Sequence, residues 1–246
     1  MKWFYNTVRF LFGWIVRAVY PVKIVGDKKS IPKNGKVIVL SNHREVPAIV
    51  AYIPGYRHFL AKKELSEKRI PNWFFVNMGA FYVDRGKVDL KTIKTGLNYL
   101  KKGEGLAIFP EGTRNRNGED LQEVKGGAAL FAIKGQAPVI PLIWHSRIRP
   151  FRRNYLYVGE PIDLSEFYKG RADSVTVAAA ASLIESRMKE DKDFIDDYVI
   201  NKRWKNKKKQ LEGNIAPKLR LWQRDKKSRY ACDKKCADLF DRHSFA

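Results

Sequence analysis

The chain has 246 residues, 44% of them hydrophobic and 13% aromatic, so it can bury the core of one α/β domain of ordinary size. Its formal net charge of +22 favours an anionic partner, such as an acidic membrane surface, a phosphorylated substrate or nucleic acid. Only two cysteines occur, Cys232 and Cys236, which excludes a disulfide framework and indicates a reducing, intracellular setting.

Residues 1–21 predict an amphipathic helix that contacts a membrane. Lys2, Arg9 and Arg17 interrupt the aromatic and aliphatic run, so it is too charged for a spanning helix, and it lacks the cleavage site of a signal peptide. These cations share one narrow face, which is typical of a helix lying among lipid headgroups. The alternative is a helix packed on its own domain. Pro21 ends the helix because its ring cannot continue the ladder.

Apolar runs between residues 22 and 161 predict the strands of a sheet. They are residues 22–26, 37–40, 58–61, 80–83, 106–109, 138–144 and 154–159. Helical patterns occur at 90–101, 126–134 and 173–189. Near-continuous apolar strands that alternate with helices are typical of an α/β fold. We therefore expect one domain over residues 22–197, with a largely parallel central sheet flanked by helices.

Residues 198–246 differ in composition and predict a basic C-terminal appendage, helical in part or disordered. They hold 15 Lys and Arg against 5 Asp and Glu, which accounts for 10 of the 22 excess positive charges. Trp204 and Trp222 stand among these cations, so this segment could stack on bases or lie at a membrane interface. A solvated tail is the commonest meaning of such a charge run.

Three predicted strands end in polar loops, which is where open α/β sheets bind ligands. LSNHR places His43 after residues 37–40, FYVDRG places Arg85 after 80–83, and FPEGTR follows 106–109. In the last loop, Gly112 allows close backbone approach to a ligand, and Arg114 can grip a phosphate with two parallel hydrogen bonds. Each motif taken alone would also suit a surface loop with an ordinary ion pair.

A later apolar run, VIPL at 139–142, contains Pro141. Proline is unusual in a central strand unless the strand borders a site. The order and spacing of LSNHR, FYVDRG, FPEGTR and VIPL resemble the glycerolipid acyltransferase family, the 1-acylglycerol-3-phosphate acyltransferases. The resemblance covers about residues 20–165, includes AKKEL at 61–65, and does not reach the appendage.

The resemblance implies a role for each matching residue. His43 corresponds to the general base that activates a glycerolipid hydroxyl, and the alkoxide then attacks an acyl thioester with no acyl-enzyme intermediate. Arg85 corresponds to a ligand of the acceptor phosphate, and Lys62 or Lys63 could assist it. Pro141 would shape the pocket. The acceptor site would be completed by Glu111, Gly112, Thr113 and Arg114.

The same resemblance implies the partners of the protein. The acceptor is a lysophospholipid, with lysophosphatidic acid converted to phosphatidic acid in phospholipid synthesis. Acyl-CoA or acyl carrier protein supplies the acyl group as co-substrate, so no metal and no cofactor are expected. A bilayer-dissolved acceptor implies a membrane-associated enzyme at the cytoplasmic face, on an anionic surface. Nucleic acid ranks last among the expected partners.

One position departs from the family pattern. The aspartate that stands five residues after the family's histidine corresponds to Ala48, which cannot hold or stabilise an imidazole. In a serine-protease triad the orienting acid contributes on the order of 10⁴ in turnover. Three explanations compete: Ala48 is an engineered replacement that silences the enzyme, Glu45 or Glu111 orients His43 instead, or the chain is a natural inactive relative that binds lipid.

Two main functions follow from the sequence. The first is a membrane-associated acyltransferase that makes phosphatidic acid, with its activity left open by Ala48. The second is a non-catalytic lipid-binding relative of the same family. Nucleic-acid binding through residues 198–246 is a third, side activity.

Overall fold

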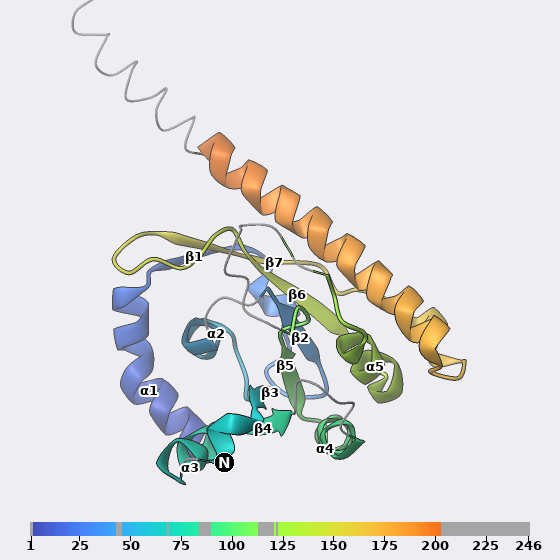
Figure 1. Cartoon of the computed structure of the whole chain (residues 1–246). Coiled ribbons are helices and arrows are strands. Elements are labelled where there is room, and N and C mark those ends of the chain that lie inside the picture. Colours follow the sequence, from blue (N-terminus) through green and yellow to red (C-terminus); the bar gives the residue numbers. More distant parts are fainter. Residues whose placement is uncertain are drawn as a thin grey trace, which may run out of the picture. The chain divides into compact units, whose positions relative to one another are not determined.

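The computed structural model describes residues 2–42, 46–67, 69–83, 90–112, 121 and 123–202, without the side chains of residues 46, 62 and 65. Seven strands form one sheet in the order β1-β7-β6-β2-β5-β3-β4 (Figure 1). In chain order they are β1 Val22–Gly26, β2 Ile38–Ser41, β3 Arg57–Lys62, β4 Ala80–Val83, β5 Gly105–Ile108, β6 Val139–Trp144 and β7 Asn154–Val158.

The sheet is mostly parallel, as the sequence predicts. Strands β2 to β6 run in one direction, and β7 pairs antiparallel with β6. Strand β1 pairs parallel with β7 at the edge of the sheet. Each of the seven apolar runs forms a strand, so the predicted α/β fold with a largely parallel sheet is confirmed.

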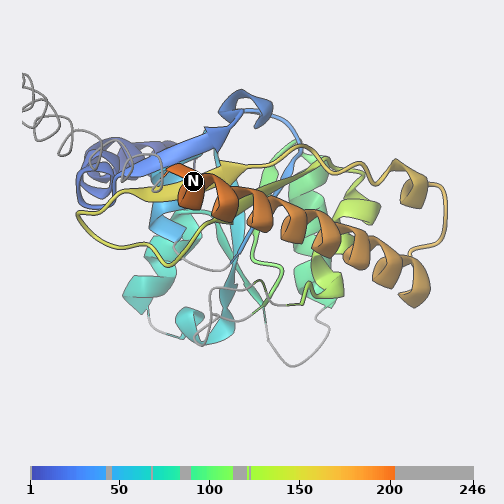
Figure 2. The same cartoon turned by 90° about the horizontal axis from the view of Figure 1, so that it is seen from above.

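Helices cover both faces of the sheet (Figures 1 and 2). One side carries α1 Lys2–Val19, α2 Val46–Tyr52 and α3 Arg69–Asn77. The other side carries α4 Leu90–Lys101, α5 Gly126–Gly135 and a long helix that begins at residue 174. The predicted helices at 90–101 and 126–134 are confirmed, and helical backbone continues from residue 174 to 202, well beyond the predicted end at 189.

The chain divides into two compact units, Met1–Asp197 and Tyr198–Ala246. In the second unit, residues 198–202 are helical. The rest of the predicted appendage lies outside the described residues.

Two apolar clusters lie between the sheet and the helices α1 and α2. The larger one joins α2 to the centre of the sheet, through residues such as Ala48, Ile140 and Trp144. The smaller one joins Tyr5 of α1 to β3, β4 and β5, through Phe59, Ala80 and Ala107. Helix α2, which begins shortly after His43 in the sequence, therefore covers the centre of the sheet.

Helix α1 packs on the domain through Tyr5 and Gly13, with Phe4 and Val8 partly buried beside them. Gly13 and Tyr5 are buried, and Arg17 Nη2 donates to the Ala51 carbonyl at 2.6 Å. The side chains of the outer face of α1 are exposed, namely Trp3, Phe10, Leu11, Phe12, Trp14 and Ile15. A surface helix ordinarily turns its large apolar side chains toward the core, so this exposed apolar face is unusual. Among the described residues, no helix is both long and apolar enough to cross a bilayer.

Polar contacts fasten α1 at both ends. Near its start, Lys2 Nζ lies 3.0 Å from Glu104 Oε1, and the Tyr5 hydroxyl donates to the Gly55 carbonyl at 3.3 Å. Near its end, the Tyr52 hydroxyl donates to the Tyr20 carbonyl at 2.9 Å. These contacts hold the helix so that its outer face stays turned to solvent.

Candidate active site

The C-terminal ends of five parallel strands meet at one edge of the sheet, and the predicted site loops follow β2, β4 and β5 there. Four of the predicted site residues are described, namely Ala48, Glu111, Gly112 and Pro141. The others lie outside the described residues: His43, Arg85, Thr113 and Arg114, together with the side chain of Lys62. Their roles stay predictions.

Asn42 fastens the end of β2 to the end of β6. It is buried, its Nδ2 donates to the Trp144 carbonyl at 3.0 Å, and its Oδ1 accepts from the Trp144 amide at 2.9 Å. The side chain thus adds a rung to the parallel ladder just beyond Ser41. This anchor directly precedes His43, and motif-based reasoning passed over it.

Ala48 lies on α2 with 2% of its surface exposed. Its surroundings are aliphatic and aromatic, because it belongs to the larger core cluster with Ile49, Ile140 and Leu142. An aspartate at this position would lose most of its hydration and would need a hydrogen-bonding partner. The position expected to hold the orienting acid is therefore a well-filled apolar site in this chain.

The loop after β5 turns sharply at Gly112. Its φ is +68°, a left-handed conformation that favours glycine, and its amide donates to the Phe109 carbonyl at 3.0 Å. Glu111 is buried beside it, with 3% of its surface exposed. A buried carboxylate and a turn reserved for glycine are both features of a built site rather than of a solvated loop.

Lys125 joins this loop, although it was not predicted as a site residue. Its amide donates to the Pro110 carbonyl at 3.0 Å, which ties the start of α5 to the loop. Its side chain passes over Gly112, since a Cβ on that glycine would lie 3.2 Å from Lys125 Nζ. The only sequence signal is a lysine directly before the glycine pair that opens α5.

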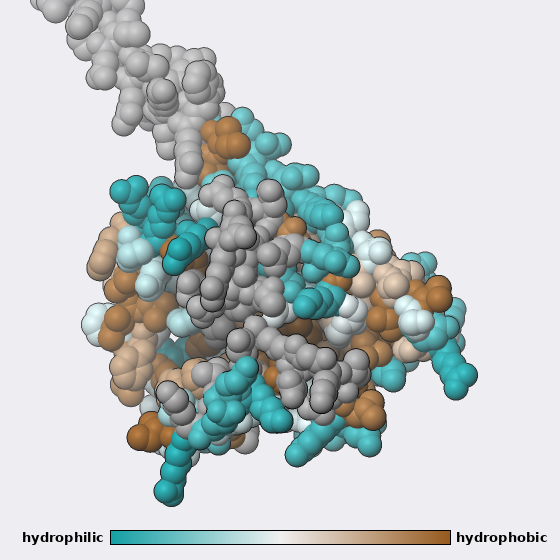
Figure 3. All heavy atoms as spheres, viewed as in Figure 1, coloured by the Kyte–Doolittle hydropathy of each residue, from teal (hydrophilic) through white to brown (hydrophobic). Residues whose placement is uncertain are grey.

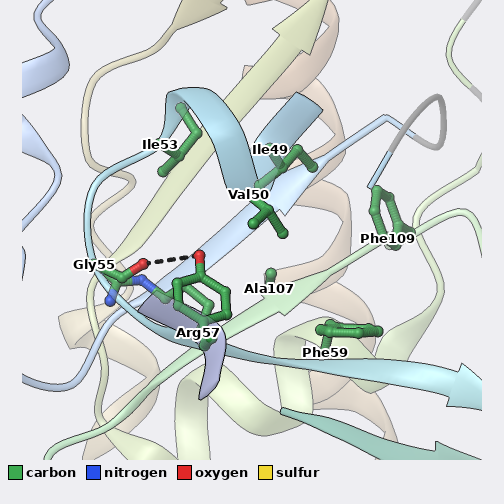
Figure 4. A pocket seen from close by; sticks show the side chains of 9 residues that line it. Ile49, Val50, Ile53, Gly55, Arg57, Phe59, Ala107 and Phe109 are labelled. Atoms are coloured by element: carbon green, nitrogen blue, oxygen red, sulfur yellow. Dashed lines mark hydrogen bonds between the residues drawn. The ribbon is translucent and has the colours of Figure 1, made fainter. Parts of the chain in front are cut away.

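A small apolar pocket runs beside α2 (Figure 4). Phe109, which directly precedes the Pro110–Glu111 turn, forms one end of it, and Arg57 with Gly55 lies toward the other. The remaining lining residues are Tyr5, Ile49, Val50, Ile53, Phe59 and Ala107. The pocket therefore connects the site loop with the underside of α1.

Arg57 lies at the end of the pocket away from Phe109 and bonds the backbone there. It is buried, Nη1 donates to the Tyr56 carbonyl at 2.7 Å, and Nη2 donates to the Pro32 carbonyl. Burial lowers its pKa to about 10. Backbone carbonyls take these two hydrogen bonds, so Arg57 serves the local structure.

Pro141 lies on the opposite face of the sheet from this pocket. Ile140 and Leu142 point into the cluster with Ala48, and side chains alternate along a strand, so the Pro141 ring faces the other way. There it packs on Gly159, where an added Cβ would lie 2.7 Å from Pro141 Cγ. Pro141 is thus absent from the lining of the pocket in Figure 4.

The fold explains how a central strand tolerates this proline. The Pro141 carbonyl accepts from the Gly159 amide at 3.0 Å, so its missing N–H faces the same side, toward β7. The antiparallel ladder with β7 begins only at Leu142. Pro141 therefore interrupts no regular ladder.

Two other histidines are held by carboxylates. His145 Nδ1 lies 2.7 Å from Asp196 Oδ1, which joins the end of β6 to the long helix. His58 is buried at the start of β3, where Nε2 lies 2.7 Å from Glu104 Oε2 and Nδ1 lies 3.2 Å from the Gly79 carbonyl. His58 stands at the opposite end of its strand from the site loops.

The match to known proteins agrees with this arrangement. Residues 23–145 match the family model described as Acyltransferase, a region that spans β1 to the end of β6 and includes every predicted site residue.

The chain belongs to this acyltransferase family.

The sequence of this acyltransferase is similar to those of several curated proteins. It is 30% identical over 181 residues to a 1-acyl-sn-glycerol-3-phosphate acyltransferase of Bacillus subtilis, a match that covers 70% of this chain and 89% of the relative. A protein of the same description from Streptococcus pneumoniae is 32% identical over 157 residues, covering 61% of this chain and 54% of that protein.

One solved structure shares the fold of this acyltransferase. It is the crystal structure of the 1-acyl-sn-glycerophosphate (LPA) acyltransferase of Thermotoga maritima, with a TM-score of 0.56 and 23% sequence identity. The match covers 78% of each chain. This likeness concerns the fold alone.

Proposed function

We propose that the protein is a membrane-associated 1-acylglycerol-3-phosphate acyltransferase. It moves a fatty acyl group from acyl-CoA or acyl carrier protein to the free hydroxyl of lysophosphatidic acid and so makes phosphatidic acid for phospholipid synthesis. The observation that carries the proposal is the match to the Bacillus subtilis enzyme over 89% of its length, across the strand-end loops that form the candidate site.

In this proposal His43 is the general base. Its imidazole takes the proton of the acceptor hydroxyl, and the oxygen attacks the thioester carbonyl. The tetrahedral intermediate expels the thiolate, which receives the proton from the imidazolium. A thioester is already activated, so the reaction needs no cofactor. Asn42 contributes by fixing the backbone directly before the base.

The acceptor phosphate requires cations at the same edge of the sheet. We assign this role to Arg85 and Arg114, assisted by Lys62, because in the sequence each follows or ends a strand of the parallel set. Glu111, Gly112 and Thr113 would complete the acceptor site. The position of Lys125 over Gly112 adds a further ammonium group at this loop.

The acyl chain needs an apolar compartment next to the site. The small pocket between Phe109 and Arg57 marks a place for this compartment, because its walls are aliphatic and aromatic and it begins at the Pro110–Glu111 turn. It is too small to hold an acyl chain as it stands, so the lining side chains would have to move apart when the chain binds. An acyl chain entering at Phe109 would run along β5 beneath α2, toward Tyr5 of α1.

Association with a bilayer is supported by the outward apolar face of α1, which continues onto α3. The Phe4 ring lies 5.2 Å from that of Trp73 and 5.9 Å from that of Phe74. Ile70 and Trp73 are themselves exposed. Apolar groups gather over α1 at the left of Figure 3. An anionic cytoplasmic leaflet would bury this apolar face and attract the net charge of +22.

The decisive test compares the chain as it stands with Ala48→Asp in a transfer assay with radiolabelled acyl donors and lysophosphatidate. We expect Ala48→Asp to raise turnover about tenfold or more, since an orienting acid can contribute on the order of 10⁴. Ala51→Asp is the matched control, because Ala51 is equally buried on the same helix. The proposed function is rejected if, with every donor, neither the unmodified chain nor Ala48→Asp transfers more acyl group than His43→Ala does.

The second candidate function is non-catalytic lipid binding by a relative of the same family. The apolar packing of Ala48 favours it, since the site of the expected acid is filled without a carboxylate. Turnover by the unmodified chain that depends on His43 excludes this candidate. Vesicle sedimentation without turnover, both before and after Ala48→Asp, supports it.

A further inference from the structure

The loop between β6 and β7, residues 145–153, carries a dense set of exposed basic side chains. They are Arg147, Arg149, Arg152 and Arg153. At its tip Phe151 exposes 79% of its surface. Among the described residues, no carboxylate lies within ion-pair distance of any of the four guanidinium groups.

This loop, here called the β6–β7 loop, is held in one shape by Asn154. The buried Asn154 side chain accepts from the Arg149 amide at 2.9 Å and donates to the carbonyls of Arg149 and Arg152 at 3.1 and 2.9 Å. Phe151 adopts a φ of +55°, which is rare for a bulky residue. The aromatic ring is therefore presented to solvent by a structured turn.

The β6–β7 loop adjoins the end of α1. The Phe151 amide donates to the Val19 carbonyl at 2.6 Å, and the Asn154 amide donates to the Pro21 carbonyl at 2.9 Å. Figure 1 shows the loop beside the C-terminal end of α1, and Figure 3 shows hydrophilic side chains above the apolar ones on that side. A basic rim therefore borders the outer face of α1.

We propose that the β6–β7 loop binds the headgroups of acidic phospholipids in a bilayer. Guanidinium groups suit lipid phosphates because they donate two parallel hydrogen bonds, and Phe151 would enter the interface beside Trp14 of α1. The inference rests on the membrane association proposed above and assigns its anionic specificity to this loop. A nucleic acid would match the arginines but would leave the outer face of α1 in water.

The test measures binding of the full chain to sedimented vesicles, made of phosphatidylcholine alone or mixed with phosphatidylglycerol. The loop variant changes all four arginines to glutamine. Its matched control changes Lys94 and Lys101 of α4, Lys102 directly after α4, and Lys134 of α5 to glutamine. Both variants then have a net charge of 22 − 4 = +18. Phe151→Gly is a third variant, and it suits the positive φ, so the fold is retained.

We expect the loop variant to bind mixed vesicles on the order of a hundredfold more weakly, with little change on neutral vesicles. The control should lose less than about fivefold on either vesicle. Phe151→Gly should weaken binding to both by about tenfold.

Equal losses in the loop variant and the control would overturn the proposal, because the effect would then be one of net charge. Unchanged binding by the loop variant would do the same. The proposal is also contradicted if the loop variant differs from the unmodified chain only in self-association, measured by light scattering, or only in nucleic-acid binding. Binding is measured without acyl donor or acceptor, so failure of the enzymatic proposal is recorded separately.

Discussion

Asn42 and Trp144 join the ends of two neighbouring strands by exchanging two hydrogen bonds. The Asn42 amide group bonds both the carbonyl and the amide of Trp144, at 3.0 and 2.9 Å, as a strand residue would. The two strands end at the edge of the sheet that carries the candidate site, and His43 follows at once. The backbone directly before the predicted base is therefore fixed by a side chain to which no proton transfer is assigned.

Replacing Asn42 by alanine should destabilise the protein. The change leaves the buried amide and carbonyl of Trp144 without partners, and each costs about 1–3 kcal/mol. We expect the free energy of unfolding to fall by about 2–4 kcal/mol. Urea denaturation measures it, and Asn77→Ala is the control, because its amide donates to the Trp73 carbonyl at an exposed site. Equal losses in the two variants would contradict the prediction.

Acid should destabilise the fold through His58. Burial lowers the pKa of His58, although its hydrogen bond with Glu104 opposes the shift. The unfolded chain therefore binds a proton more readily than the folded one, and stability present above the ordinary histidine pKa declines as pH falls below about 6.5. His58→Phe can keep the stack on Tyr99, whose ring lies 3.5 Å away, but removes this titration.

The measurement is the free energy of unfolding between about pH 7 and pH 5, the range in which histidine ordinarily titrates. We expect a decline in the unmodified chain and a flatter profile in His58→Phe. Glu104 acts at lower pH: burial raises its pKa, but hydrogen bonds from Lys2 and His58 outweigh burial and lower it. Profiles of the same slope in both proteins would refute the role of His58.

Asp191 should show the opposite pH dependence. Burial raises its pKa to about 6, Arg187 opposes the shift, and Glu190 and Glu160 add to it. A raised folded pKa gives stability that is present below the unfolded value and is lost as pH rises through about 6. Asp191→Asn should therefore gain about 1 kcal/mol at neutral pH. Asp193→Asn, exposed on the same helix, should change little.

Helix α3 should contribute to vesicle binding through Ile70. Its side chain is 80% exposed, and that of Val175, on the far side of the sheet, is 76% exposed. We expect Ile70→Ser to bind mixed vesicles about fivefold more weakly, whereas Val175→Ser binds normally, because only the first adjoins the outer face of α1. Sedimentation measures both, and equal behaviour of the pair would argue against a bilayer contact at α3.

The strands could be predicted because each is a nearly continuous apolar run set apart by polar or helical segments. The antiparallel direction of β7 could not, since an apolar run such as 154–159 does not say in which direction its strand runs. The orientation of α1 was also out of reach. Periodicity separates a polar face from an apolar face, but it does not say which of them meets the domain.

The candidate site was predictable only where motifs mark it. Asn42 lies within the LSNHR motif, but its role depends on the distant Trp144, and no motif marks Lys125, which contacts Gly112. Pro141 carries a motif, yet its ring lies on the face away from the pocket. A motif therefore located the edge of the sheet correctly without giving the direction of each side chain.

Under the membrane association proposed above, the contacts of α1 with the domain would make lipid a folding ligand. Lys2, Tyr5 and Arg17 tie this helix to Glu104, Gly55 and Ala51, so whatever binds its outer face also holds the domain in its native state. By mass action, vesicles at a hundred times their dissociation constant would add about 2.7 kcal/mol to the free energy of unfolding. The melting temperature of this protein should thus rise with lipid concentration, which makes thermal denaturation a direct titration of its membrane affinity.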